Sequence, residues 1–413
     1  MQKITTLDIV LGGGEGARLF PLTGDRSKPA VPIGKWRVID FVLNNIMNSG
    51  SQHVYLLVQY KPDSLIRHVE NVWNQNDVHV HLVRSDHTYD GTTDAVYQNR
   101  GLISKIRPNV VNVFGGDHIY LMDVSQMNHF HLENHADLTI AAIPVPLEEG
   151  EKFGVLEVDE KGRIIAFKEK PKNPKPIPTN PEFCLASMGM YNFHPQKLLE
   201  SLKADAKKMK PEGNGTEAAE LVAANPHLYS MHDFGHNLIP LMVGEGKAYA
   251  YNFATNRVTG ASGQPYWRDI GKLIDFYNAN RDMLGLNPAI RLDLPNWPIK
   301  TFREAQAEPQ VASGAKVLES ILAEGVVIGR SVVEESSLSY NVKVGHRAVI
   351  NQSVLLGHAT VGDKVRLNRT IVDRNVHLPN GIEIGYYEDE DRARNFTIVP
   401  GGVTVIPKNY KFS

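Results

Sequence analysis

The sequence predicts an α/β protein of two domains, a Rossmann-like, mostly parallel sheet followed by a left-handed parallel β-helix of hexapeptide repeats. The 413 residues exceed the length that one hydrophobic core usually supports, which favours two domains. Residues 1 to about 280 alternate short apolar runs with helical patterns, as parallel sheets covered by helices do. From Val326 onward, small apolar triplets recur at about six-residue steps, a pattern typical of a β-helix.

The first domain is expected to alternate strands and helices up to about residue 285. A Pro-rich loop is predicted at 171–181, and a polar, partly helical insertion with a flexible tip at Gly213–Gly215 is predicted over 203–227. Strands are expected at 4–11, 53–58, 109–114 and 138–143, and helices at 40–48, 94–106 and 124–134.

The second part of the chain changes in composition after Trp297. A plain β-meander is the alternative to the β-helix, but the repeat persists over several coils and none offers a long strand. After the repeats we expect a charged loop at 386–394 and a closing strand at 396–407. The predicted division is 1–285 for the first domain, 286–315 for a linker and 316–413 for the β-helix.

Bulk composition excludes several classes of partner. The net charge of −2 gives no basic surface for nucleic acid. No stretch approaches the ~20 apolar residues of a membrane span, so no membrane partner is expected. The single cysteine, Cys184, permits no intrachain disulfide and favours a cytoplasmic location.

A glycine loop follows the first predicted strand, which ends at Leu11. Glycines allow backbone N–H groups to approach phosphate oxygens closely, and two cations, Arg18 and Lys28, follow the loop. An ordinary strand-to-helix turn is the alternative for the glycines alone, and no Gly-Lys-Ser/Thr closes a P-loop. The glycines concerned are Gly12, Gly13 and Gly14.

Two aspartates are candidates for holding a metal ion. Asp117 follows the predicted strand that ends at residue 114, and Asp269 lies in the segment 266–271. Each alone could cap a helix or sit in a turn. As a pair at strand ends beside a phosphate loop they suit Mg²⁺, which prefers one or two carboxylates with phosphate oxygens and water.

Several further residues carry polar groups suited to a sugar, a phosphate or a base. Lys170 could pair with a phosphate monoester and Glu169 could accept sugar hydroxyls, although a solvated charge run explains both equally well. Gln59 could read a base edge, and Tyr89 could stack on the base. Gly91 and Thr92 could contact the base or ribose. Ser187, Tyr191 and Asp233 could hydrogen-bond a sugar ring that Gly189 allows to approach closely, with strand packing and a helix cap as the alternatives.

Four motifs give the chain a resemblance to a known family. TYDGTTDAV, LASMGMY, HDFG and YWRDIG, together with the glycine loop, resemble the bacterial glucose-1-phosphate adenylyltransferases nearly end to end. The resemblance implies transfer of AMP from Mg·ATP to α-D-glucose 1-phosphate for glycogen or another α-glucan. It implies that Arg18 and Lys28 neutralise the triphosphate and that Asp117 and Asp269 hold the metal. It adds Leu11 to the ATP site and Trp267 to the sugar pocket.

The resemblance also implies regulation and assembly. Relatives pair through the β-helix as tetramers, so a homotetramer is expected. A small anionic effector is expected in the cleft between the domains, although Asp25 and a shortened loop at Gly34 make the usual bisphosphate activator doubtful. A non-catalytic regulatory subunit, a transferase for another sugar or base, and a hexapeptide-repeat acyltransferase remain alternatives. The expected effector cations are Lys35, Arg37, Arg369 and Arg374.

Overall fold

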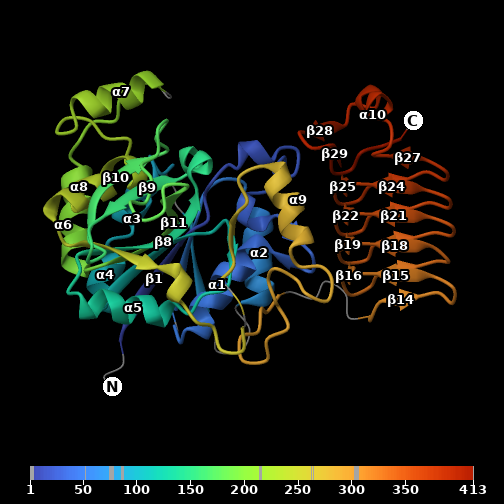
Figure 1. Cartoon of the computed structure of the whole chain (residues 1–413), viewed down its shortest axis with the longest axis horizontal. Helices are drawn as coiled ribbons and strands as arrows, with labels where there is room; N and C mark the ends of the chain where they lie inside the picture. Colours follow the sequence, from blue (N-terminus) through green and yellow to red (C-terminus); the bar gives the residue numbers. More distant parts are fainter. Residues whose placement is uncertain are drawn as a thin grey trace.

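The computed structural model describes most of the chain. It covers residues 4–51, 53–73, 79–84, 88–213, 216–261, 263, 265–301 and 307–412. Figure 1 shows a sheet with helices on both faces beside a column of short stacked strands, and the helix α9 (Leu273–Arg281) lies between the two. This is the two-domain α/β architecture that the sequence predicted.

One half of the large sheet is parallel. The strand β1 lies in its middle, and its apolar residues alternate between the two faces, as a strand buried on both sides requires. Leu11 pairs with Leu57 on one side and with Gly115 on the other, so three strands end at the same edge. The parallel strands, in spatial order, are β6 (Val110–Gly115), β1 (Thr6–Leu11), β4 (His53–Val58) and β5 (His79–Arg84).

The other half makes the sheet mixed, where the sequence predicted one that is mostly parallel. The long strand β11 (Phe183–Phe193) runs antiparallel to β6 and to β8 (Leu138–Pro146). A tight turn closed by the hydrogen bond from Gly162 N to Asp159 O joins two further antiparallel strands. The remaining members of this half are β9 (Gly154–Val158), β10 (Ile164–Glu169) and β12 (Ala248–Asn252).

Helices cover both faces of the sheet, and each face has its own apolar core. Leu7 and Ile9 of β1 face one core, and Val10 faces the other. The helix predicted over 94–106 is two helices separated by Asn99 and Arg100, and the Asn99 side chain donates to Ala95 O. The Val10 side holds α1 (Val38–Asn48), α2 (Asp63–Val72) and α5 (Val124–Glu133), and the Leu7 side holds α3 (Thr92–Gln98), α4 (Gly101–Ile106), α6 (Pro195–Asp205) and α8 (Ile239–Glu245).

Smaller elements complete the first domain. β7 (His118–Tyr120) pairs with β13 (Trp267–Asp269), and β2 (Pro32–Ile33) pairs with β3 (Trp36–Arg37). The predicted insertion contains the end of α6 and the helix α7 (Thr216–Ala224), which stands clear of the sheet in Figure 1. Asn214 and Gly215 of its predicted tip lie outside the described residues.

The second domain is a left-handed β-helix of hexapeptide repeats, with three sheets whose strands pair in parallel except at one terminal hairpin. Its pairing begins with β14 at Gln310, inside the segment that the sequence assigned to the linker. One sheet holds β14 (Gln310–Val311), β17 (Val327–Ile328), β20 (Lys343–Val344), β23 (Thr360–Val361) and β26 (His377–Leu378). The second holds β15 (Lys316–Leu318), β18 (Val332–Glu334), β21 (Val349–Asn351), β24 (Arg366–Asn368) and β27 (Glu383–Ile384). The third holds β16 (Ile321–Leu322), β19 (Ser337–Leu338), β22 (Val354–Leu355), β25 (Thr370–Val372), β29 (Val403–Ile406) and β28 (Thr397–Val399).

The end of the β-helix differs from two expectations. The charged loop predicted at 386–394 contains a helix, α10 (Glu388–Ala393), in which Glu388 pairs with Arg392 and Glu390 pairs with Arg394 at i,i+4 spacing. The closing strand predicted at 396–407 is an antiparallel hairpin of β28 and β29.

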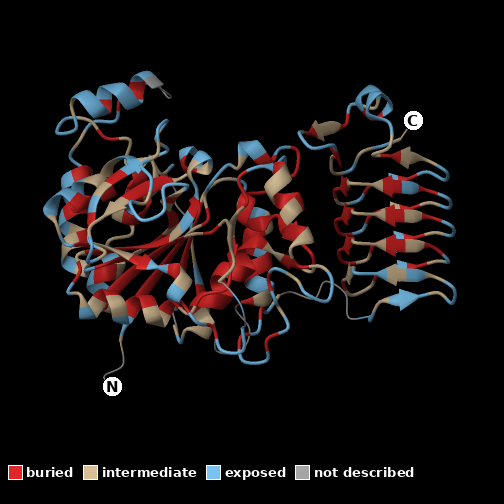
Figure 2. Ribbon diagram, in the orientation of Figure 1, coloured by how far each residue is buried: buried red, intermediate tan, exposed pale blue. Residues whose placement is uncertain are grey.

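The two domains share an apolar core. Phe276 and Tyr277 of α9 pack in one buried cluster with Leu356 and Ile371 of the β-helix. Figure 2 shows buried residues along the column of strands that faces the first domain, whereas β14 is exposed. Because this contact buries residues of both domains, their relative placement is set by packing rather than by the linker alone.

Candidate active site

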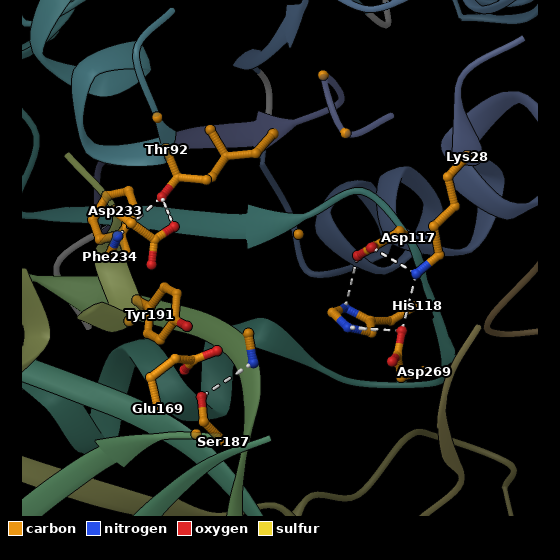
Figure 3. Close-up of a pocket in the computed structure, with 18 of the residues that line it drawn as sticks. Lys28, Thr92, Asp117, His118, Glu169, Ser187, Tyr191, Asp233, Phe234 and Asp269 are labelled. Atoms are coloured by element: carbon orange, nitrogen blue, oxygen red, sulfur yellow. Dashed lines mark hydrogen bonds and ion pairs between the residues drawn. The ribbon is translucent and has the colours of Figure 1, made fainter. Parts of the chain in front are cut away.

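The largest group of predicted site residues surrounds one cavity of about 500 Å³ at the carboxyl ends of the parallel strands. Ligands in open α/β sheets bind at this edge. Figure 3 shows two groups of side chains facing this cavity, one around Lys28 and Asp117 and one around Asp233 and Tyr191. The predicted residues that line it are Leu11, Gly13, Gly14, Arg18, Lys28, Gln59, Tyr89, Gly91, Thr92, Asp117, Glu169, Lys170, Ser187, Gly189, Tyr191, Asp233, Trp267 and Asp269.

The glycine loop contributes two of its three predicted glycines to the cavity. Gly13 and Gly14 line it, but Gly12 lies beneath, where its N–H donates to Leu57 O. A Cβ at Gly12 would come within 2.8 Å of Leu56 Cδ1, so this glycine permits the loop to pack on β4. Its role is therefore close packing rather than lining the cavity.

One end of the cavity holds a buried lysine between two carboxylates. Lys28 Nζ lies 2.8 Å from Asp117 Oδ2 and 3.0 Å from Asp269 Oδ1. Lys28 belongs to a short 3₁₀ turn, Lys28–Ala30, Asp117 follows β6, and Asp269 ends β13. The fold thus brings together three residues that are far apart in the sequence.

The charges in this cluster shift one another's protonation. Burial acts to lower the pKa of Lys28, but the two facing carboxylates outweigh it and raise that pKa. Burial likewise acts to raise the pKa of Asp117, but the Lys28 ammonium outweighs it and holds that pKa well below its usual range. The lysine is therefore charged and both carboxylates are compensated by one cation.

His118 belongs to this cluster, although the sequence prediction did not select it. Its Nδ1 lies 3.5 Å from Asp117 Oδ1, and its Nε2 lies 3.7 Å from Asp269 Oδ1. Its buried Nδ1 makes no hydrogen bond within the described part of the chain. One ligand atom from each of the three residues lies within 4.8 Å of the others. Two carboxylates and a ring nitrogen suit a divalent cation, so the residues fit a metal site.

The other end of the cavity is built where two distant loops meet. Thr92 Oγ1 donates to Asp233 Oδ2 at 2.9 Å and accepts from Phe234 N at 2.9 Å. Gly91 has φ +147°, and a Cβ there would come within 2.3 Å of His232 O. Only glycine permits this approach, so the TYDGTTDAV motif and the HDFG motif depend on each other.

A carboxylate stands between these two ends. Glu169, at the end of β10, packs so closely that a Cβ at Gly154 or Gly235 would come within 3.0 Å of its Oε2. Lys170 pairs with Glu169 Oε1 at 2.5 Å and is half exposed. Both residues therefore line the cavity, and the lysine ammonium is held by Glu169 at its exposed side.

Aromatic rings form the wall behind this carboxylate. Tyr191 stacks on Phe234 with ring centroids 5.7 Å apart, and burial raises the pKa of its hydroxyl, which stays protonated. Trp267 packs its ring 5.5 Å from those of His118 and Phe153. Gly189 has φ +70°, and a Cβ there would meet His118 Cε1 at 3.0 Å.

The four predicted effector cations do not share one pocket. Arg37 and Arg374 line a small pocket of about 20 Å³ between the domains, together with Tyr340. Lys35 is adjacent, since its carbonyl accepts a hydrogen bond from the Tyr340 hydroxyl. Arg369 lies apart, where it donates to Gly401 O and faces the Tyr277 ring.

Several lining residues were missed by the sequence prediction. His118 could have been found, because it directly follows Asp117 in the same motif. Lys152 and Phe153 had no such signal, since they lie at the end of a 3₁₀ helix, Leu147–Lys152, that only the fold brings to the cavity. The lining residues not selected from the sequence are Pro29, Leu57, Ala95, Gly115, His118, Lys152, Phe153, Gly154, Phe234 and Gly235.

Comparison with known protein families covers both domains of the chain. The family model described as "Nucleotidyl transferase" matches residues 7–285, and the model described as "GlmU-like, C-terminal hexapeptide" matches residues 302–406. A mixed sheet with a cation and two carboxylates at its edge is thus the catalytic domain of a nucleotidyltransferase.

The relatives narrow this class. The chain is 42% identical to the glucose-1-phosphate adenylyltransferase of Thermus thermophilus, and the match covers 100% of both chains. It is 39% identical to that of Deinococcus deserti, again over 100% of both. It is 37% identical to glucose-1-phosphate adenylyltransferase 1 of Vibrio parahaemolyticus, over 97% of this chain and 98% of that one. The chain belongs to the glucose-1-phosphate adenylyltransferase family.

Among the described helices, none combines the length and the apolar character needed to cross a membrane.

Proposed function

We propose that the protein transfers AMP from Mg·ATP to α-D-glucose 1-phosphate, giving ADP-glucose and pyrophosphate for glycogen or another α-glucan. The observation that carries this proposal is the two-ended cavity. A cation and two carboxylates stand at one end, and hydroxyl-binding groups stand at the other. The names of the full-length relatives support the choice of both substrates.

The proposed ATP site lies at the glycine loop. Arg18 and Lys28 face the triphosphate and neutralise its charge, while Asp117 and Asp269, with His118 beside them, hold Mg²⁺. When bound, Mg²⁺ screens the charge on the phosphate oxygens. The groups proposed to contact the base, ribose and phosphates are Leu11, Gly13, Gly14, Gln59, Tyr89, Gly91, Thr92 and Asp117, and Gly12 supports the loop from below.

The proposed sugar site lies at the other end. Lys170 leaves Glu169 to pair with the phosphate of glucose 1-phosphate, and Glu169 then accepts sugar hydroxyls. The proposed sugar contacts are Glu169, Lys170, Ser187, Gly189, Tyr191, Asp233 and Trp267.

The reaction needs no nucleophile from the protein. A phosphate oxygen of glucose 1-phosphate attacks the α-phosphorus, a new P–O bond forms, and the bond from the α-phosphorus to the bridging oxygen breaks. Pyrophosphate leaves with that oxygen and with the electron pair of the broken bond. Positioning and charge neutralisation by the chain's own cations are sufficient for such a transfer.

One assay tests the proposal. Pyrophosphate release is measured with each of four nucleoside triphosphates against glucose 1-phosphate, with other sugar 1-phosphates as comparisons. ATP with glucose 1-phosphate is expected to be the preferred pair. A preference for another base or sugar identifies a different transferase, and no release with any pair identifies a non-catalytic subunit.

The proposal extends to assembly, location and regulation. We propose a homotetramer in the cytoplasm, with no nucleic-acid or membrane partner; the single Cys184 supports a reducing compartment. Light scattering tests the tetramer, and a stable monomer contradicts it. The sequence divided the chain into 1–285, 286–315 and 316–413. Because the strand pairing of the β-helix begins at Gln310, we propose that the linker ends before that residue. We further propose a small anionic effector at Arg37 and Arg374, with Lys35 adjacent, which would have to widen the pocket of about 20 Å³. Arg369, which the sequence also assigned to the effector, lies outside that pocket.

A further inference from the structure

A buried ion pair crosses from the catalytic domain to the β-helix. Arg26 Nη2 lies 2.8 Å from Asp373 Oδ1 and 2.7 Å from Asp373 Oδ2. Both side chains are almost fully enclosed, with exposed fractions of 4% and 0%. Asp373 lies directly after β25, and its carboxylate is also held by the backbone N–H of Arg374 at 2.7 Å.

This pair lies two residues from the lysine of the active site. Arg26 precedes Ser27, which begins the short turn that carries Lys28. We name residues 12–28 the phosphate segment. It reaches from the glycine loop and Arg18 at the cavity to Arg26 at the β-helix. A displacement of Arg26 would therefore move Lys28 relative to Asp117 and Asp269.

The phosphate segment is braced internally, so that a shift at one end is transmitted to the other. Thr23 Oγ1 donates to Gly16 O at 3.0 Å, and Gly24 N donates to Pro21 O at 3.0 Å. Gly16 packs against Lys28, since a Cβ there would come within 2.9 Å of Lys28 Cβ. Asp25 adds a second tie to the β-helix through its ion pair with Lys408.

Stability alone is a weak explanation for this arrangement. Burial acts to raise the pKa of Asp373, and the pKa stays raised even with the Arg26 guanidinium beside it. The carboxylate is thus held in a place that disfavours its charge, and apolar side chains often hold such an interface equally well. What apolar residues lack is directional hydrogen bonding, which here fixes the guanidinium in one orientation. Arg26 Nη2 donates to both oxygens of Asp373, and Arg26 Nε donates to Asp25 Oδ1 at 3.1 Å.

We propose that Arg26 is a positioning residue for the nucleotide phosphates: its pairing with Asp373 of the β-helix fixes the phosphate segment so that Lys28 and Arg18 meet the triphosphate. The inference rests on the proposed function for the identity of that ligand. It makes the β-helix part of the machinery that binds the nucleotide.

The chain offers a matched control for this proposal. Arg281 of α9 pairs with Glu335 of the β-helix at 2.6 Å, so it also joins the two domains. Neither residue lines the cavity, and neither lies in the phosphate segment. Glu335→Gln therefore removes a charge from the same interface without touching the route to Lys28.

The experiment uses the full-length chain and its variants Arg26→Ala, Arg26→Lys, Asp373→Asn and Glu335→Gln. Calorimetry measures the Kd of Mg·ATP and of Mg·pyrophosphate, and steady-state kinetics measures KM for each substrate. Arg26→Ala and Asp373→Asn are expected to weaken both phosphate ligands about tenfold, because small misplacements of positioning groups are costly. KM for glucose 1-phosphate is expected to stay near the wild-type value, Arg26→Lys to be intermediate, and Glu335→Gln to leave all values unchanged.

Three results would overturn the proposal. One is an unchanged Kd for Mg·pyrophosphate in the Arg26 and Asp373 variants. A second is an equal increase in KM for ATP and for glucose 1-phosphate. A third is that Glu335→Gln weakens the binding of the phosphate ligands as much as the Arg26 and Asp373 variants do. Either of these two results indicates a purely structural role. If Arg26→Ala does not fold, as circular dichroism would show, Arg26→Lys and Asp373→Asn carry the test. Failure of the proposed function is distinguishable, because pyrophosphate is a common product of nucleotidyltransferases and its binding does not depend on the base or the sugar.

Discussion

Lys28 and Asp117 form an ion pair of 2.8 Å between residues that are 89 positions apart in the sequence. The same ammonium also reaches Asp269, so one cation compensates two carboxylates at the place where a divalent metal fits. A metal ion held by these carboxylates would compete with the lysine for the same oxygen atoms. On the proposed function, a bound triphosphate would give the lysine another partner and free the carboxylates.

This competition predicts that Lys28→Met binds metal better in the absence of nucleotide. Removing the ammonium leaves two carboxylates uncompensated, so the affinity for Mn²⁺ is expected to rise about tenfold, while turnover falls. Calorimetric titration with Mn²⁺ measures the affinity. Lys152→Met is the control, since Lys152 also lines the cavity but pairs with Glu149. Weaker metal binding in Lys28→Met would show that the lysine supports the metal site instead.

Asp117→Asn is expected to abolish most of the turnover and leave the fold intact. On the proposed function the substitution removes a charge that would hold the metal on the phosphates, so kcat should fall about 100-fold or more. The assay is pyrophosphate release at saturating Mg²⁺, with circular dichroism to verify folding. Asp123→Asn is the matched control, because Asp123 caps α5 and an asparagine can still cap a helix. Near-normal turnover in Asp117→Asn would contradict the assignment.

Lys170→Ala is expected to act on one substrate only. A charge-assisted hydrogen bond to the sugar phosphate is lost, so KM for glucose 1-phosphate should rise about tenfold or more while KM for ATP changes little. Lys172→Ala, an exposed lysine two residues further along the same loop, serves as the control. Equal increases in the KM values for glucose 1-phosphate and for ATP would show that Lys170 does not act on glucose 1-phosphate alone.

His131 makes the stability of the protein depend on pH. Burial lowers its pKa from about 6.5 to about 4, and nearby His194 acts in the same direction. Between these values the unfolded chain binds a proton that the folded chain does not. This histidine therefore costs stability as the pH falls from 6.5 to 4, by roughly 3 kcal/mol at the acidic end.

His131→Gln should remove this contribution and keep a hydrogen-bond partner for Thr139. We expect the urea midpoint of the variant to fall less than that of the wild type between pH 6.5 and pH 4. His129→Gln, on the same helix but exposed, should follow the wild type. If the urea midpoints of the wild type and His131→Gln fall in parallel with pH, His131 takes up a proton in the folded protein as readily as in the unfolded chain.

The effector proposal predicts that anions alter the rate and that Arg374→Ala removes the response. The rates of the wild type and of each variant are measured with and without each anion of a panel. The panel is fructose 1,6-bisphosphate, fructose 6-phosphate, 3-phosphoglycerate, AMP and phosphate. Arg369→Ala is expected to have the smaller effect, because Arg369 lies outside the pocket that Arg37 and Arg374 share. A rate that no anion alters would remove the effector site altogether.

The sequence by itself determined the features that depend on neighbouring residues. The six-residue repeat predicted the β-helix, because each short strand and its turn are encoded within one coil. The glycine loop and the strand-end aspartates predicted the position of the cavity, since parallel strands end at a common edge. The resemblance of four motifs to a known family then selected the site residues, most of which line the cavity.

The tertiary structure decided what depends on contacts between distant segments. No local signal in the sequence predicts three of these features. They are the direction of β11, the place of Lys152 and Phe153 in the cavity, and the separation of Arg369 from Arg374. The Arg26–Asp373 pair joins residues 347 positions apart. A sequence records the charge of each side chain, but which opposite charge it meets is set by how two apolar surfaces pack. Packing of that kind is a property of the whole fold.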